Sequence, residues 1–188
     1  VDVALLTHLA DDDYGRRIVR RLTDSGVRLF PESFNAVSTP RAIADVAPDG
    51  QANYWFQITW DVEAPVLPAS SVLLHTGSIA AFLPPGSQAI GAVMQSAQGK
   101  EVTFDPNIRP SLIGSHHEAL QVFEKFASLS TVVKMSDDDA RWLYPGREPA
   151  EVLKTVVALG PNIAVMTLGA EGSILANSDG MVSVPPTN

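Results

Sequence analysis

The sequence has no cysteine among its 188 residues. Disulfide bonds, thiolate metal sites and cysteine nucleophiles are therefore excluded, and the composition fits a reducing compartment. No apolar run approaches the ~20 residues that a helix needs to cross a bilayer, and no signal peptide is visible. We therefore expect a globular, cytoplasmic protein without a membrane partner.

Positive charge is scarce, because 13 Lys and Arg stand against 21 Asp and Glu, giving a net charge of −8. No cluster of basic residues is interleaved with aromatics, so the sequence predicts no nucleic-acid partner. An anion site in such a chain must be local, built from a few cations and backbone N–H groups, usually with a divalent metal. The acidic residues 11–13 precede a predicted helix and favour its dipole, with metal binding as the open alternative.

Several motifs of catalysis and nucleotide binding are also missing. Neither a G-x-x-x-x-G-K-[ST] loop nor a G-x-G-x-x-G fingerprint occurs, which excludes P-loop and Rossmann dinucleotide sites. The four histidines have no H-E-x-x-H spacing, and no G-x-S-x-G elbow supports a serine hydrolase. Any functional site must therefore be inferred from where polar residues fall in the fold.

Apolar β-rich runs alternate with helical patterns through most of the chain. The strands are predicted at residues 3–7, 72–75, 102–104, 131–135 and 163–167. The helices are predicted at residues 14–23, 87–98, 115–128, 137–143 and 151–159. Intervals of about thirty residues between strands are typical of βαβ units. The sequence therefore predicts an α/β, doubly wound, mostly parallel sheet flanked by helices.

Residues 27–60 depart from this pattern, because their apolar period is two. A turn predicted at residues 48–50 separates two alternating runs, which indicates a β excursion. One face of the second run carries aromatic and aliphatic side chains, namely Tyr54, Phe56, Ile58 and Trp60. A small lid, a subunit interface and ordinary core packing all fit these faces.

The predicted organisation has three parts. Residues 1–26 begin an α/β core, residues 27–60 form a β lid excursion, and residues 61–188 continue the core with its nucleotide-binding part. Because the chain opens inside an apolar strand and finishes directly after another, we expect it to be the interior of a longer protein.

Polar residues follow four of the predicted strands. They are Thr76, Gly77 and Ser78; Asp105, Asn107 and Arg109; Lys134, Ser136 and Asp139; and Thr167, Gly169 and Gly172. The carboxyl ends of parallel strands share one edge of a sheet, where open α/β folds bind their ligands. We therefore predict that these segments converge on one site.

Two of these segments also have purely structural interpretations. Ser136 with an acid three residues later is typical of a capping box, while Asp139 could instead hold a metal-bound water beside Lys134. Gly169 and Gly172 fit a turn between two strands, or a loop whose N–H groups approach an anion. Spacing alone leaves both alternatives open.

Read in order, these motifs resemble the PfkB-type carbohydrate kinases, and within that ribokinase and fructokinase family the bacterial fructokinase-like members. The segments that carry the resemblance are VALLTHLADDDYGRRI, DGQANYWF, HTGSIA, FDPNIRP, VVKMSDDD and TLGAEG. They are collinear over essentially the whole chain. The resemblance implies a ribokinase-like fold and an ATP-dependent phosphotransferase acting on a sugar hydroxyl.

The resemblance also implies roles for individual residues. Asn107 and Arg109 would bind substrate and the transferring phosphate, and a lid bearing Tyr54 and Phe56 would cover the sugar and could pair two subunits as a homodimer. The residues implied at the nucleotide are Lys134, Ser136, Thr167, Gly169 and Gly172.

The implied cofactors are ATP and Mg²⁺, with a monovalent cation such as K⁺ as a further possibility. Asp139 would contact Mg²⁺ through water, although Ser136 and Asp139 stand where the family often has Asn and Glu. By the family pattern, paired glycines and an Asn that grip the sugar would precede Val1.

No catalytic base is assigned in this chain, since the family's G-A-G-D motif would follow Asn188. We therefore expect these 188 residues to be inactive alone. The alternatives are a kinase for a 2-keto-3-deoxy sugar acid or a nucleoside, and a non-catalytic sugar- or nucleotide-binding relative.

Overall fold

The structure is a computed structural model that describes residues 2–46 and 52–186. The side chains of residues 45, 46 and 52–54 lie outside this description, as does the turn predicted at residues 48–50. The chain divides into two compact units. Unit 1 comprises Val1–Pro65 and Pro84–Ala89, and unit 2 comprises Val66–Leu83 and Ile90–Asn188.

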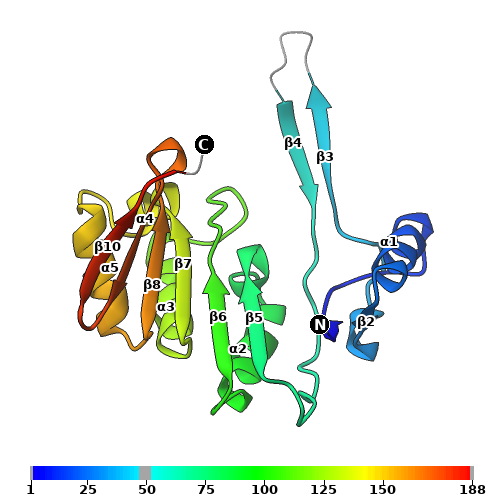
Figure 1. Ribbon diagram of the computed structural model, residues 1–188. Helices are drawn as coiled ribbons and strands as arrows, with labels where there is room; N and C mark the ends of the chain where they lie inside the picture. Colours follow the sequence, from blue (N-terminus) through cyan, green and yellow to red (C-terminus); the bar gives the residue numbers. More distant parts are fainter. Residues whose placement is uncertain (1, 47–51, 187–188) are drawn as a thin grey trace. The chain divides into compact units, whose positions relative to one another are not determined.

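Unit 1 combines a parallel pair of strands with an antiparallel hairpin (Figure 1). Its elements are β1 (Val3–Leu5), α1 (Asp13–Asp24), β2 (Val27–Leu29), the 3-10 turn η1 (Pro31–Ser33), β3 (Arg41–Val46) and β4 (Ala52–Gln57). β1 and β2 pair in parallel, whereas β3 and β4 pair antiparallel with Arg41 opposite Gln57. The alternation predicted over residues 27–60 therefore covers strands with different partners, and the hairpin begins only at Arg41.

The hairpin is shorter than the predicted alternation, because β4 ends before Ile58 and Trp60. The Trp60 ring packs edge-on against His8, with 6.2 Å between the ring centroids. The backbone carbonyl of Trp60 accepts a hydrogen bond from the Gly86 N–H. Trp60 thus belongs to the packing of unit 1 outside the hairpin. The predicted domain boundaries at residues 26 and 60 stay a prediction.

Asp12 fixes the start of α1. As the N-cap residue it accepts a hydrogen bond from the Gly15 N–H at 2.8 Å, and it also accepts from the Thr39 N–H and hydroxyl at 2.9 and 2.7 Å. One carboxylate therefore joins the helix to a segment 27 residues away. These donors, the Gly15 N–H first, lower the pKa of Asp12 from 3.8 to about 2.

The lowered pKa of Asp12 predicts a dependence of stability on pH. Because the pKa in the folded state lies below the unfolded value, this contribution is present above pH ~4 and is lost as pH falls toward ~2. As pH falls from about 4 to about 2, we expect the urea midpoint of Asp12→Asn to fall less than that of the wild type, because the Asn amide can cap the helix but does not titrate. Parallel curves of urea midpoint against pH for the two proteins would contradict this assignment.

Unit 2 is a six-stranded mixed sheet with helices. Its elements are β5 (Leu73–Gly77), η2 (Ser78–Ala81), α2 (Gly86–Ser96), β6 (Glu101–Asp105), α3 (His116–Ser128), β7 (Val132–Ser136), α4 (Asp137–Leu143), α5 (Pro149–Ala158), β8 (Ile163–Thr167), η3 (Gly169–Glu171), β9 (Ser173–Asn177) and β10 (Gly180–Val184), with α2 beginning in unit 1. The strand order is β10-β9-β8-β7-β6-β5, with β5 to β8 parallel and β9 and β10 antiparallel. The predicted α/β class with a mostly parallel sheet is confirmed.

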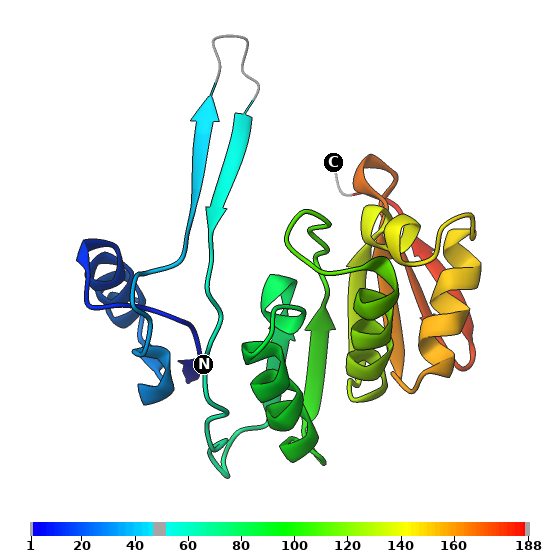
Figure 2. The ribbon, with the colours of Figure 1, turned by 180° about the vertical axis from the view of Figure 1, so that it is seen from behind.

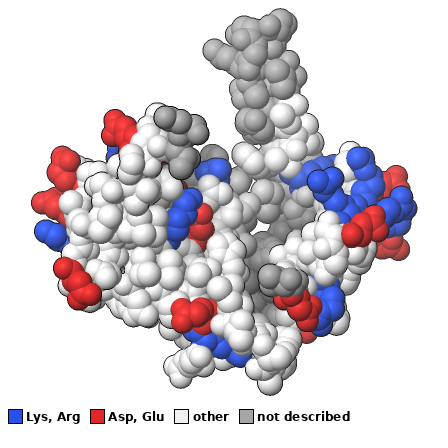
Figure 3. Space-filling view, in the orientation of Figure 1, with Lys and Arg blue, Asp and Glu red and all other residues white. Residues whose placement is uncertain are grey.

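The core of unit 2 lies between the sheet and the helices α2, α3 and α5, which cover the same face (Figure 2). The Phe104 ring, 1% exposed, lies 5.9 Å from the Phe123 ring and 5.7 Å from the Phe126 ring. The opposite sheet face carries few charged side chains (Figure 3). No helix among the described residues is long and apolar enough to span a bilayer.

Candidate site at the carboxyl edge of the sheet

The carboxyl ends of β5 to β8 lie at one edge of the six-stranded sheet, as predicted. The four strands pair in order and in parallel, with Gly77 opposite Asp105 and Ser136 opposite Thr167. Hydrogen bonds and an ion pair join the polar residues that follow neighbouring strands. The structure therefore brings the polar ends of these four strands together.

The loop after β6 meets the end of β5 through two strained residues. Pro106 follows the last residue of β6, and Asn107 then adopts a φ of 41°. Its amide donates a hydrogen bond of 3.2 Å to the Ser78 hydroxyl, and Ser78 itself has a φ of 57°. Left-handed backbone at non-glycine residues costs free energy and clusters at functional sites. Ser78, which the sequence placed in the converging segment after β5 without a role of its own, thus helps to hold the Asn107 side chain.

An ion pair joins the ends of β6 and β7. The Lys134 ammonium lies 2.9 Å from Asp105 Oδ2, while the buried Oδ1 of Asp105 has no hydrogen-bond partner among the described residues. The predicted nucleotide contact of Lys134 stays a prediction, since its charge is here directed at Asp105. The signal for this pair is present in the sequence, because opposite charges stand near the ends of neighbouring predicted strands.

Arg109 places a cation at this edge. Its side chain is exposed and donates one hydrogen bond of 2.9 Å, to the carbonyl of the adjacent Ile108. No carboxylate in the described part of the chain lies within ion-pair distance of its guanidinium. Arg109 therefore keeps most of its donors for a ligand.

Asp139 makes two connections at once. With Ser136 it forms a reciprocal capping box at the start of α4, in which Asp139 Oδ2 accepts from the Ser136 N–H and hydroxyl at 2.9 and 2.7 Å. Its Oδ1 accepts from the Ile108 N–H at 2.7 Å. The residue is 5% exposed. The capping interpretation is confirmed, and the predicted contact with a metal-bound water stays a prediction.

Gly169 begins the 3-10 turn η3 between β8 and β9, Gly172 directly follows the turn, and Thr167 ends β8. The Thr167 hydroxyl lies 3.5 Å from the Met135 carbonyl, which ties it to β7. Gly172 has a φ of 94°, and a Cβ there would lie 2.2 Å from the Val184 carbonyl oxygen. Packing against β10 therefore requires glycine at this position. A Cβ at Gly169, whose φ is 55°, would meet open space.

The two candidate residues of the hairpin belong to unit 1. Phe56 lies on β4 opposite Ala42 and is 38% exposed. Tyr54 lies opposite Ala44, and its side chain is outside the described part of the structure. Sugar binding by these two residues stays a prediction.

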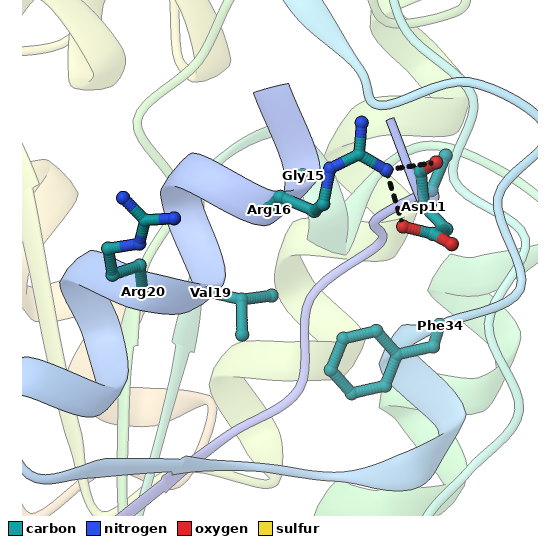
Figure 4. Close-up of a pocket in the computed structure, with 7 residues that line it drawn as sticks. Asp11, Gly15, Arg16, Val19, Arg20 and Phe34 are labelled. Carbon is teal, nitrogen blue, oxygen red and sulfur yellow. Dashed lines mark hydrogen bonds and ion pairs between the residues drawn. The ribbon is translucent and has the colours of Figure 1, made fainter. Parts of the chain in front are cut away.

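A pocket of about 390 Å³ lies elsewhere in unit 1, beside α1 (Figure 4). Val19 and Phe34 contribute its apolar walls, and Arg16 and Arg20 contribute cations. Arg16 is engaged by Asp11 in an ion pair of 2.7 Å. None of the predicted site residues lines this pocket, so the sheet edge remains the candidate site.

Comparisons with known proteins agree with this architecture. A family model described as pfkB family carbohydrate kinase matches residues 1–188. A fructokinase from Rhizobium leguminosarum bv. trifolii is 28% identical, over 98% of this chain but only 59% of that relative. The chain therefore spans well under two thirds of the relative's length.

Two solved structures show the same fold. A PfkB protein from Polaromonas sp. JS666 has a TM-score of 0.85 at 20% identity, over 100% of this chain and 68% of that chain. A fructokinase from Vibrio cholerae O395, solved with fructose, ADP and calcium ion bound, has a TM-score of 0.79 at 24% identity, over 97% of this chain and 62% of that chain. Because the family model covers every residue, the chain belongs to the pfkB family of carbohydrate kinases.

Proposed function

We propose that the protein is an ATP-dependent sugar kinase that transfers the γ-phosphate of ATP to a sugar hydroxyl, with fructose as the preferred acceptor. The observation that carries the proposal is the Asp105 to Arg109 loop, which holds an unpaired guanidinium at the carboxyl edge of the sheet among the described residues. Family membership supports the reaction type. The similarity to fructokinases supports the acceptor.

In this proposal Arg109 and Asn107 act on the acceptor and the transferring phosphate. Phosphoryl transfer needs positioning and charge stabilisation more than covalent chemistry, and an arginine fork matches phosphate oxygens. The Asn107 side-chain amide donates one N–H to the Ser78 hydroxyl, and its second N–H and its oxygen can orient a sugar hydroxyl. None of the predicted site residues is assigned as the base that takes the hydroxyl proton.

The nucleotide phosphates would lie at the ends of β7 and β8. The hydrogen bonds of turn η3 are donated by the N–H groups of Glu171 and Gly172, so among the described residues the first two N–H groups of the turn, those of Gly169 and Ala170, remain available to an anion. The Ser136 and Thr167 hydroxyls lie on neighbouring strand ends. Lys134 adds a cation beside them, shared with Asp105.

In this proposal Mg²⁺ would be held mainly by the nucleotide phosphates and water, with few protein ligands. No group of three or more His, Cys, Asp or Glu side chains there is arranged to hold a metal ion. Asp139 is the candidate ligand, but Ser136 and Ile108 already donate to both of its oxygens.

The β3–β4 hairpin is the proposed lid and homodimer contact. Its described side chains Ile43, Trp55 and Phe56 are 42%, 54% and 38% exposed. Apolar exposure of this kind is typical of surfaces that become covered. The assignment of the hairpin to sugar cover and subunit pairing rests on the family pattern.

The test is an ADP-release assay on the protein encoded by the complete reading frame. Fructose is compared with glucose, ribose, 2-keto-3-deoxygluconate and adenosine, with ATP and Mg²⁺ present and with or without K⁺. We expect the highest kcat/KM with fructose. A higher value for another acceptor would replace the proposed substrate, and nucleotide binding without turnover of any acceptor would favour a non-catalytic relative.

A further inference from the structure

We propose that Asp139 is a positioning residue for the loop that carries Asn107 and Arg109, rather than a metal ligand. The inference rests on the proposed kinase function for its catalytic consequence, but its structural part can be measured without activity. It starts from one contact, the 2.7 Å hydrogen bond from the Ile108 N–H to Asp139 Oδ1.

This contact is strong and shielded from water. Hydrogen bonds to an ionised carboxylate are shorter and about twice as strong as those between neutral groups, and this one is buried. Asp139 is 5% exposed and Ile108 is 6% exposed. A buried carboxylate that lost its donors would be costly, so the loop and the carboxylate hold each other in place.

The contact also lies where it controls the site residues. Ile108 is the residue between Asn107 and Arg109, so holding its N–H fixes the peptide plane that joins it to Asn107 and restrains the backbone one residue before Arg109. The other oxygen of Asp139 is held by Ser136 at the start of α4. Asp139 thus links the junction of β7 and α4 to a loop 31 residues earlier in the chain and fixes the loop relative to it.

This geometry suggests a physical reason why Ser136 and Asp139 stand where the family often has Asn and Glu. The Ser136 hydroxyl donates to Asp139 Oδ2 and accepts from the Asp139 N–H, which draws the carboxylate close to the helix start. Glu118 makes the same cap with Ser115 at the start of α3, but a Glu is one methylene longer, so at residue 139 its second oxygen would not fall where Asp139 Oδ1 meets the Ile108 N–H. The shorter side chains of Ser136 and Asp139 therefore suit a carboxylate that caps α4 and also holds the Ile108 N–H of the loop.

The test uses Asp139→Asn in the protein encoded by the complete reading frame, with Asp138→Asn as the matched control. Asp138 lies on the same helical turn but is exposed and pairs with Arg141. Amide exchange of a peptide covering residues 105–113 should be at least about tenfold faster in Asp139→Asn, because the Ile108 N–H loses its charged acceptor. The control should exchange like the wild type. Unchanged exchange in Asp139→Asn would overturn the proposal.

Kinetics separate positioning from metal binding. We expect kcat/KM for the acceptor to fall about 10²-fold in Asp139→Asn with the half-saturating Mg²⁺ concentration unchanged, because a misplaced loop weakens transition-state contacts. A large rise in half-saturating Mg²⁺ would overturn the proposal in favour of a metal ligand. If Asp139→Asn does not fold, Asp139→Glu keeps the charge and should show the same two effects at smaller size. An inactive wild type would refute the proposed function, while the exchange result still decides the clamp.

Discussion

Replacing Gly77 with alanine is expected to destabilise the protein by about 3 kcal/mol, because the new methyl group cannot fit between two paired strands. Gly77 is the last residue of β5 and lies opposite Asp105 on β6. A Cβ built on it would lie 2.0 Å from the Asp105 carbonyl oxygen and 3.0 Å from its carbonyl carbon. Both neighbours are backbone atoms, so only a shift of one strand relieves the collision.

The expected damage reaches the candidate site, since Asp105 begins the loop of Asn107 and Arg109 and pairs with Lys134. Moving β6 away from β5 would stretch the strand ladder and the contact between Ser78 and Asn107. We therefore expect Gly77→Ala to lose stability and activity together. Urea unfolding followed by circular dichroism measures the first effect, and the ADP-release assay measures the second.

Gly91→Ala is the matched control for this prediction. Gly91 lies inside helix α2, and a Cβ there would meet the Phe126 ring at 3.5 Å, an ordinary van der Waals distance. Alanine favours helix over glycine by about 0.5–1 kcal/mol, so this variant should be neutral or more stable. Equal loss of stability in both variants would show that the β5–β6 approach is not what requires glycine at residue 77.

The elements that the sequence predicted best are those with strong local signals. Helix α4 and strand β8 have the predicted bounds, because Ser136 caps the helix and a short apolar run ends at Thr167. β5 instead runs on through Thr76 and Gly77. Its end is decided by pairing with β6, which local propensity does not contain.

What the sequence missed depends on partners far along the chain. The alternation at residues 27–29 looks the same whether the strand joins a hairpin or pairs in parallel with β1, as β2 does. For Asp139, the sequence predicted the capping box with Ser136. It did not predict the hydrogen bond to Asp139 Oδ1, because the donor is the backbone N–H of Ile108. Backbone donors carry no residue-type signal, so a contact of this kind becomes visible only in the folded chain.

Replacing Arg109 with alanine should have the largest effect on catalysis. We expect kcat/KM for phosphoryl transfer to fall by about 10³-fold, the magnitude typical for a cation that stabilises charge on a transferring phosphoryl group. Arg109→Lys keeps the charge but not the planar fork, and we expect a smaller loss. The ADP-release assay with the preferred acceptor measures both variants.

The loss in Arg109→Ala should be separable from unfolding, and this makes the prediction decisive. The Arg109 side chain is exposed, and its one hydrogen bond within the described structure goes to the adjacent Ile108 carbonyl, so its removal should leave the urea midpoint unchanged. Arg147→Ala is the matched control, because Arg147 is also exposed and its guanidinium contacts the Tyr144 ring and the Thr155 hydroxyl, neither of which is a predicted site residue. Full activity in Arg109→Ala, or an equal loss in Arg147→Ala, would remove Arg109 from the proposed site. A selective loss at unchanged stability would place the charge of Arg109 in the transition state, where the loop between β6 and α3 presents it.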